Sequence, residues 1–178
     1  MTQHSTQPHD RAPTQAILFD KDGTLFDFQK TWAPWAATAI QDLAQAEGVA
    51  LRQADQDIPQ DLVYVIAKAI GFDLEQGAFR ADSLAVAGTA NDVARALSQV
   101  MTGLSEPEVL ARLMPAKYSM SPVSVPQLKL ALDHLRLAGF RLGVVTNDFE
   151  NVAQEHLDQA GLQGVFDVVI GCDSGFGA

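Results

Sequence analysis

Three short runs rich in apolar residues stand out along the chain. The first, residues 16–19, is continuously apolar and ends abruptly at Asp20. The second, residues 141–146, reads Arg-Leu-Gly-Val-Val-Thr, and the third, residues 165–171, is rich in β-branched residues. A strand buried on both faces of a parallel sheet needs apolar side chains at every position, not at every second position. The three runs therefore predict three neighbouring strands of a parallel sheet.

In the last third of the chain, apolar residues also recur at steps of three and four, which is typical of helices. Residues 127–138 form one such segment, which ends at Gly139. A second segment begins at Asn147 or Asp148 and runs to about residue 160. Helices that connect parallel strands are the usual crossovers of α/β proteins, so this part of the chain predicts an α/β fold.

Residues 29–120 show only helical patterns and separate the first predicted strand from the other two. The spacing of apolar residues predicts helices over residues 31–48 and 61–70. Two further helices are predicted to begin at capping boxes, one formed by Thr89 and Asp92 and one formed by Ser105 and Glu108. We therefore expect an α/β core, a three-layer arrangement around a Rossmann-like parallel sheet, interrupted by an inserted all-helical cap domain.

The predicted domain boundaries follow from this order of elements. Residues 1–14 are polar and are expected to form a disordered tail. Residues 15–28 and 121–178 are assigned to the core, and residues 29–120 are assigned to the helical cap. Pro122 marks the return from the cap to the core, because proline interrupts regular helices.

The chain is strongly acidic, which limits its partners. Its 178 residues include 22 Asp and Glu against 12 Lys and Arg, giving a formal net charge of −10 at pH 7. Such a charge repels nucleic acid phosphates and anionic lipid headgroups. No apolar run approaches the roughly 20 residues that a membrane-spanning helix needs. We expect neither nucleic acid nor membrane as a partner, and the sequence leaves the oligomeric state open.

A single cysteine, Cys172, excludes an intrachain disulfide and a cysteine-based metal cluster. One unpaired cysteine is compatible with a reducing compartment. The first 15 residues contain neither the basic start nor the apolar stretch of a secretory signal. These features predict a cytoplasmic protein.

Candidate chemistry concentrates at the end of the first predicted strand, where Asp20, Asp22 and Gly23 follow one another closely. Ligands bind at this end of the strands in α/β sheets. Two adjacent carboxylates are unfavourable unless a cation lies between them or one of them takes a proton. Mg²⁺ with a phosphate resolves this conflict, and Gly23 allows a tight turn that exposes backbone amides to an anion. The alternative is an ordinary Asp-Gly turn with incidental acids.

The segment Asp20-Lys21-Asp22-Gly23-Thr24, placed after a hydrophobic strand, resembles the first motif of the haloacid dehalogenase superfamily, most of whose members are Mg²⁺-dependent phosphatases. Residues 142–147, a hydrophobic strand ending in Thr146, resemble the second motif. A helical insertion directly after the first motif is similar to the cap of the phosphoglycolate phosphatase-like branch. The resemblance implies a Rossmann-like core and a small phosphorylated metabolite as substrate.

The resemblance also implies roles for individual residues. Asp20 would be the nucleophile that forms an aspartyl-phosphate, and Asp22 would be the general acid and base. Mg²⁺ would bind the Asp20 carboxylate and the backbone carbonyl of Asp22. Thr146, Asn147 and Gly23 would contact the phosphoryl group and stabilise its charge in the transition state. Without the resemblance, Thr146 and Asn147 are simply a strand end and a helix cap.

Other conspicuous residues receive ordinary interpretations. Lys21 stands where the family usually has an apolar residue, and its side chain is expected to point away from the two aspartates. Trp32 and Trp35 are interpreted as packing residues of the first cap helix, with a place at the substrate entrance as the alternative. His134 and His156 are expected to be unremarkable surface or core residues of helices.

The resemblance breaks near the end of the sequence. The family's third motif supplies a Lys or Arg and its fourth supplies further Asp ligands for Mg²⁺, yet no Lys or Arg follows Arg141. We interpret the chain as truncated before both motifs and expect the 178 residues to be inactive by themselves. Two function classes remain: a Mg²⁺-dependent phosphatase acting on a phosphoglycolate-like monoester, and a non-catalytic fragment or binding module. A phosphomutase or phosphonate hydrolase is the alternative within the first class.

Overall fold

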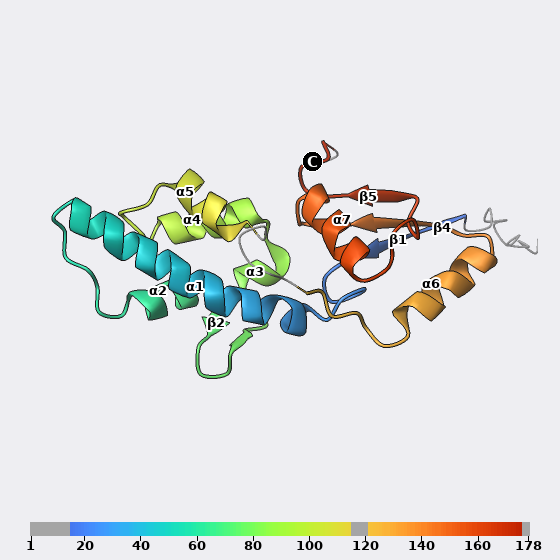
Figure 1. Ribbon diagram of the computed structural model, residues 1–178, viewed down its shortest axis with the longest axis horizontal. Helices are drawn as coiled ribbons and strands as arrows, with labels where there is room; N and C mark the ends of the chain where they lie inside the picture. Colours follow the sequence, from blue (N-terminus) through green and yellow to red (C-terminus); the bar gives the residue numbers. More distant parts are fainter. Residues whose placement is uncertain (1–14, 115–120, 176–178) are drawn as a thin grey trace, which may run out of the picture.

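The chain forms two regions, one built around a sheet and one built mainly of helices, which meet near the middle of the molecule (Figure 1). The computed structural model describes residues 15–114 and 121–175. The tail expected at residues 1–14 lies outside the described residues.

The predicted parallel sheet is present. Its strands are β1 (Ala16–Asp20), β4 (Arg141–Val145) and β5 (Val168–Ile170), paired side by side in the order β1-β4-β5. Both pairings are parallel, with Leu18 opposite Gly143 and Gly143 opposite Val168. The prediction of three adjacent parallel strands is therefore confirmed, although β5 is shorter than the apolar run that predicted it.

Helices α6 (Leu128–Leu137) and α7 (Glu150–Gln159) cover one face of this sheet. Leu132 of α6 and Leu157 of α7 belong to the same buried cluster as Leu142 and Val144 of β4. On the other face Leu18 is 64% exposed and Val168 is 44% exposed. Within the described residues, the sheet thus carries one of the two helical layers expected of a three-layer core.

The start of α7 differs from the prediction. The residue that precedes its first turn is Phe149, not Asn147 or Asp148. The amide of Glu150 at the first helical position donates instead to Asp173 Oδ1, at 2.8 Å, from the loop after β5. Asn147 and Asp148 are therefore free to face the carboxyl end of the sheet.

The insertion between β1 and α6 is helical, with one small exception. Its elements are α1 (Phe28–Gln53), α2 (Leu62–Ala69), β2 (Phe72–Asp73), β3 (Ala78–Phe79), α3 (Leu84–Ala87), α4 (Ala90–Ser98) and α5 (Glu106–Leu113). Both predicted capping boxes are present, at the starts of α4 and α5. The antiparallel pair β2-β3 was not predicted, because strands of two residues are too short to show an alternating pattern.

Helix α1 is longer than the spacing of apolar residues predicts. It begins three residues earlier because the Asp27 carboxylate accepts the amide of Lys30 and caps the helix. It continues past Gly48, which is buried within the helix. Along its length α1 contributes Ala36, Ile40 and other apolar residues to a buried cluster shared with α2, α4 and α5. Among the described residues, no helix is both long enough and apolar enough to cross a membrane.

Two chain segments connect the sheet region with the helical region, and they lie side by side. The amide of Asp27 donates to the carbonyl of Val123 at 2.8 Å, and the amide of Val125 donates to the carbonyl of Leu25 at 3.0 Å. The hydroxyl of Thr31 accepts the amide of Val123 at 3.0 Å. These contacts fix the base of α1 next to the end of β1. The predicted boundaries between core and cap, one between residues 28 and 29 and one between residues 120 and 121, remain predictions.

Gly171 fixes the loop that follows β4, and its replacement provides a test of the fold. A Cβ atom at this position would lie 2.7 Å from the carbonyl oxygen of Asp148 and would also collide with the amide nitrogen of Glu150. Because both neighbours are backbone atoms, they cannot move without displacing the loop. We expect G171A to lower the free energy of unfolding by about 1–3 kcal/mol, as overpacking does elsewhere, measured by urea denaturation.

The matched control is G48A. A Cβ atom at Gly48 meets the side chain of Ile58 at 3.8 Å, an ordinary contact. Replacing a glycine inside a helix by alanine is expected to raise the free energy of unfolding by about 0.5–1 kcal/mol. Equal stability of G171A and wild type would contradict the tight packing of this loop.

Candidate functional site

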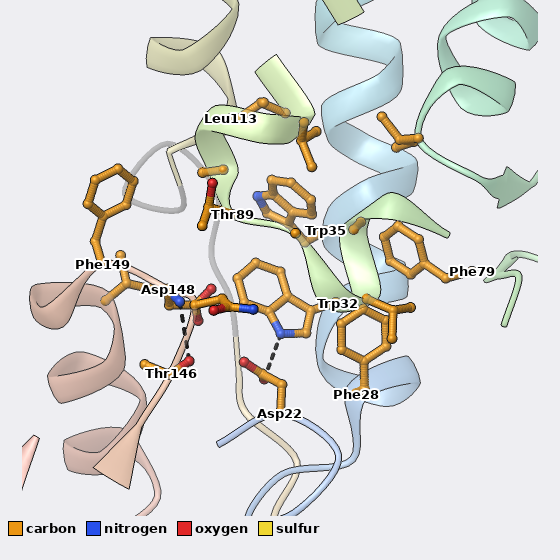
Figure 2. A pocket seen from close by; sticks show the side chains of 18 of the residues that line it. Asp22, Phe28, Trp32, Trp35, Phe79, Thr89, Leu113, Thr146, Asp148 and Phe149 are labelled. Atoms are coloured by element: carbon orange, nitrogen blue, oxygen red, sulfur yellow. Dashed lines mark hydrogen bonds between the residues drawn. The ribbon is translucent and has the colours of Figure 1, made fainter. Parts of the chain in front are cut away.

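The carboxyl ends of β1 and β4 open into one pocket that also contacts the helical region. A cavity of about 120 Å³ is lined by Asp20, Asp22, Thr146 and Asn147 together with Asp148 and side chains of the insertion (Figure 2). Four of the five residues proposed from the sequence therefore share one pocket. Gly23, the fifth, does not contribute to its lining.

Asp20 is the last residue of β1, and its carboxylate is exposed in the pocket. One carboxylate oxygen, Oδ1, accepts the backbone amide of Lys21 at 2.7 Å. This hydrogen bond orients the side chain without burying it. Asp20 is therefore available to a ligand that enters the pocket.

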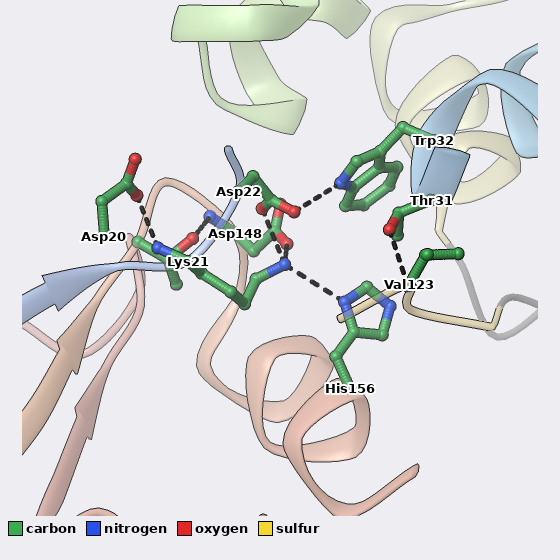
Figure 3. A network of polar contacts seen from close by, with 9 residues as sticks. Asp20, Lys21, Asp22, Thr31, Trp32, Val123, Asp148 and His156 are labelled. Carbon is green, nitrogen blue, oxygen red and sulfur yellow. Dashed lines mark hydrogen bonds and ion pairs between the residues drawn. The ribbon is translucent and has the colours of Figure 1, made fainter. Parts of the chain in front are cut away.

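Asp22 is oriented by two side-chain donors, one from each region of the molecule. Its Oδ1 accepts the indole N–H of Trp32 on α1 at 2.7 Å. Its Oδ2 forms an ion pair with the Lys21 ammonium at 2.7 Å (Figure 3). Both carboxylate oxygens are thus engaged, and the carboxylate is held in one orientation beside the ring of Trp32.

Lys21 is the centre of this polar network. Its side chain is 0% exposed, and its Nζ lies 2.7 Å from Asp22 and 2.8 Å from Asp148 Oδ2. It also lies 3.1 Å from Nδ1 of His156 on α7. An ammonium group can only donate, so Nδ1 of His156 accepts and the histidine is neutral there.

The expectation that Lys21 points away from both aspartates is wrong for Asp22. The side chain does leave the strand on the helix-covered face, opposite to Asp20, as alternation along β1 requires. The chain turns directly after β1, however, because the amides of Leu25 and Phe26 both donate to the carbonyl of Lys21. This turn brings the carboxylate of Asp22 back over the end of the lysine side chain.

Burial and the charge of Lys21 shift two neighbouring acid–base equilibria. Burial raises the pKa of Asp148 to about 6, although the Lys21 ammonium acts in the opposite direction. The nearby Asp22 carboxylate contributes to the same increase. Burial and the Lys21 charge together lower the pKa of His156 to about 4. At neutral pH the imidazole of His156 is therefore uncharged, and Asp148 is mainly a carboxylate.

Thr146 and Asn147 follow β4 and connect the site to its surroundings. The hydroxyl of Thr146 is buried and accepts the amide of Asp148 at 3.2 Å. The side-chain amide of Asn147 donates to the carbonyl of Ala87, at the end of α3, at 2.9 Å. The Asn147 side chain therefore joins the two regions of the molecule next to the pocket.

Gly23 has the positive φ of 85° that its position in a tight turn requires. Its amide donates to the carbonyl of Phe26 at 2.8 Å. The amide is therefore committed to the turn, and the structure gives Gly23 a role in shaping the motif rather than a place at the pocket.

The oxygen atoms at this site are suited to a hard cation but are few. Among the residues that the structure describes, no group of three or more His, Cys, Asp or Glu side chains is arranged to hold a metal ion. The Asp22 carboxylate is already engaged by Lys21 and Trp32, which leaves the exposed carboxylate of Asp20 as the acidic donor. Mg²⁺ typically binds through one or two carboxylates and keeps several water molecules, so an oxygen-only site of this kind fits it.

Sequence reasoning missed two residues of this site, Asp148 and His156. Trp32 packs in the buried cluster of the helical region, as its spacing predicts, and it also lines the pocket and contacts Asp22, which agrees with the alternative place at the substrate entrance. Asp148 directly follows the proposed second motif, so its position was a usable signal. His156 lies two turns into α7 and gave no signal, because nothing in the sequence relates it to Lys21.

Comparison with known proteins indicates the family of this chain. A family model described as haloacid dehalogenase-like hydrolase matches residues 14–176. The phosphoglycolate phosphatase of Nitrosospira multiformis is 28% identical over 174 residues, an alignment that covers 93% of this chain and 64% of the relative. The chain thus spans less than two thirds of the length of this relative.

Two solved structures share the fold. One is a "putative beta-phosphoglucomutase" from Thermotoga maritima, 18% identical with a TM-score of 0.51, covering 93% of this chain and 64% of that one. The other is a "putative haloacid dehalogenase-like hydrolase" from Bacteroides fragilis, 18% identical with a TM-score of 0.51, covering 91% of this chain and 65% of that one. At these identities the likeness shows the α/β fold alone.

Removing the buried ammonium should destabilise the protein strongly. In K21M the carboxylates of Asp22 and Asp148 remain close together without a cation between them. Breaking a buried ion pair from one side costs about 3–5 kcal/mol in other proteins, and we expect a loss of that order in urea denaturation. The control K129M removes an exposed lysine that pairs with Asp133 on α6, and should cost about 0.5 kcal/mol or less.

A second variant separates electrostatics from packing. In K21M/D148N one of the two uncompensated carboxylates becomes neutral, so the double variant should recover part of the stability lost in K21M. If K21M is as stable as K129M, or if D148N adds to the loss instead of reducing it, the ion pair is not what stabilises this region.

The neutral state of His156 predicts a pH dependence of stability. Because its pKa is lowered in the folded state, His156 contributes stability that is present above pH 6.5 and is lost as the pH falls towards 4. H156Q keeps an acceptor for Lys21 but cannot take up a proton. We expect the stability of wild type to fall more steeply than that of H156Q between pH 6.5 and 4, by on the order of 3 kcal/mol, in urea denaturation at stepped pH.

The control for this experiment is H134Q, which changes an exposed histidine of α6 that does not contact the network. The raised pKa of Asp148 acts in the opposite direction over part of the same pH range, but it is present in all three proteins and cancels in the comparison. Parallel stability profiles of wild type and H156Q would show that His156 does not titrate with folding.

Proposed function

The chain belongs to the haloacid dehalogenase-like hydrolase family, and we propose that it carries the nucleophile of a Mg²⁺-dependent phosphate monoester hydrolase. The observation that carries this proposal is the shared pocket of Asp20, Asp22 and Thr146, which come from the ends of two adjacent parallel strands. The curated relative named phosphoglycolate phosphatase supports a small phosphorylated metabolite as the substrate class.

Asp20 is proposed as the nucleophile. Its carboxylate is exposed in the pocket and is oriented by the amide of Lys21. A bond forms between a carboxylate oxygen and phosphorus, the bond from phosphorus to the ester oxygen breaks, and the electron pair stays on the departing alcohol oxygen. Such covalent catalysis divides one difficult displacement into two easier ones.

Asp22 is proposed as the acid and base of the two steps. In the first step the protonated side chain of Asp22 gives its proton to the departing alcohol oxygen and becomes a carboxylate. In the second step this carboxylate takes a proton from the water that attacks phosphorus and releases Asp20, which restores the protonated form. Its contacts with Trp32 and Lys21 hold the carboxylate in one place for both transfers. The hydroxyl of Thr146 and the backbone of Asn147 are proposed to contact the phosphoryl oxygens.

Mg²⁺ is proposed to bind the Asp20 carboxylate and the backbone carbonyl of Asp22. When bound, it neutralises charge between the carboxylate and a phosphate dianion. The cytoplasmic location and the absence of nucleic acid and membrane partners stay predictions from the sequence.

Replacement of Asp20 tests the proposal directly. D20N should abolish turnover of phosphate monoesters with Mg²⁺, while D22N should lower it by about 10²–10⁴-fold, the usual contribution of acid–base catalysis. In calorimetric titrations, D20N should bind Mg²⁺ at least tenfold more weakly than wild type. Turnover is measured on the 178-residue chain and on longer versions of it, since the chain spans 64% of its relative.

The matched control is D133N, which removes an exposed carboxylate of α6 that pairs with Lys129. It should leave Mg²⁺ binding and turnover unchanged. Equal heats of Mg²⁺ binding in D20N and wild type would place the ion elsewhere, and turnover that survives in D20N would rule out Asp20 as the nucleophile.

A further inference from the structure

Two polar contacts join the helical region to the ends of two neighbouring strands. Trp32 of α1 donates its indole N–H to Oδ1 of Asp22, which follows β1, at 2.7 Å (Figure 3). Asn147, which comes shortly after β4, donates its side-chain amide to the carbonyl of Ala87, the last residue of α3, at 2.9 Å. One contact therefore holds the residue proposed as acid and base, and the other holds a residue proposed to contact the phosphoryl group.

On the side of the sheet, the buried ammonium of Lys21 connects the two contacts. Its Nζ lies 2.7 Å from Asp22 and 2.8 Å from Asp148, the residue that follows Asn147. The amide of Asp148 in turn donates to the hydroxyl of Thr146 at 3.2 Å. Because separating a buried ion pair is costly, Asp22 and Asn147 belong to one firm unit.

On the side of the insertion, packing connects the two contacts. Trp32 is 9% exposed and belongs to the buried cluster of the helical region, against which Ala85 of α3 packs. Val93 of α4 is a member of the same cluster. Densely packed interiors transmit displacements instead of absorbing them. The indole of Trp32 and the carbonyl of Ala87 therefore move together.

We propose that Asn147 is a positioning residue for Asp22 and acts on it through the helical region. Two firm units that are joined at two points form a clamp, in which loss of one contact loosens the other. The coupling is reciprocal, so each contact stabilises the other by the same factor. This inference rests on the proposed function for the roles of Asp22 and Asn147, and it adds that the helical region places both groups at once.

The two chain segments that connect the regions are not part of this clamp. The amide of Asp27 donates to the carbonyl of Val123 at 2.8 Å, and the hydroxyl of Thr31 accepts the amide of Val123 at 3.0 Å. These contacts lie at the base of α1, whereas Asn147 contacts the end of α3. A variant that removes the Asn147 side chain therefore leaves the connecting segments intact.

Hydrogen exchange of the Trp32 indole N–H tests the clamp without a ligand and without turnover. This hydrogen exchanges with solvent deuterium when its contact with Asp22 opens, so the rate follows the ratio of open to closed states. The chain has two tryptophans, and the indole signal missing from NMR spectra of W32F belongs to Trp32. We expect N147A to raise its exchange rate about two- to tenfold, the range that follows from the net contribution of one hydrogen bond.

Two control variants separate the clamp from other effects. N151A removes an exposed asparagine of α7 and should leave the rate unchanged. L128A removes a buried side chain of α6 and lowers the stability of the sheet region without touching either contact. It should also leave the rate unchanged. If L128A raises the rate as much as N147A does, the indole exchanges by general unfolding and the clamp is overturned.

Gly88 allows the clamp to be weakened from the helical region. A Cβ atom at this position would lie 2.7 Å from the carbonyl oxygen of Leu84, so G88A displaces the end of α3 that carries the Ala87 carbonyl. We expect G88A to raise the exchange rate as well, and N147A to add little to it, because both variants break the same contact. Effects that multiply in the double variant would show that Asn147 does not act through Ala87, and would contradict the proposal.

Equal exchange of the Trp32 indole in N147A and wild type would show that the two contacts open independently, and would overturn the proposal. The proposed function is tested separately, by turnover and Mg²⁺ binding in D20N. The clamp and the phosphatase assignment can therefore fail independently of each other.

Discussion

The buried ammonium of Lys21 is the interaction on which the rest of the site depends. It neutralises part of the charge of Asp22, which follows β1, and of Asp148, which follows β4. Neither carboxylate could be packed so closely beside the other without it, since two like charges in a partly buried site repel strongly. The ammonium therefore fixes the ends of two strands relative to each other, and the pocket opens between those ends.

The same ammonium connects the sheet region to the helical region through Asp22. One oxygen of this carboxylate pairs with Lys21, and the other accepts the indole N–H of Trp32 on α1. Asn147 adds a second polar contact, to the carbonyl of Ala87. Because Trp32 of α1 lines the pocket and contacts the proposed acid–base residue, a movement of α1 would change the position of Asp22 and the shape of the pocket together.

The sequence predicted the parts of the molecule that follow from local patterns. Short runs rich in apolar and β-branched residues identified all three strands, and the pairs Thr89 with Asp92 and Ser105 with Glu108 correctly marked two helix starts. Contacts that depend on the path of the chain were not predictable. Lys21 contacts His156 although the two residues are 135 positions apart in the sequence, and no periodic pattern of residues relates them. Trp32 has the spacing of a core residue because it is one, and its bond to Asp22 is a property of the turn after β1.

The geometry also changes the reason for expecting a metal ion. In the sequence, the spacing of two aspartates two positions apart predicts one cation between them, and Mg²⁺ is the predicted ion. In the structure Lys21 already forms an ion pair with Asp22. Asp20 also lines the pocket, and among the described residues no Lys, Arg or His side chain pairs with its carboxylate. A phosphate dianion brought next to Asp20 adds further negative charge to a floor that also holds Asp148. The reason for proposing Mg²⁺ therefore comes from the proposed phosphate substrate together with the proposed nucleophile, and not from the spacing of the two aspartates.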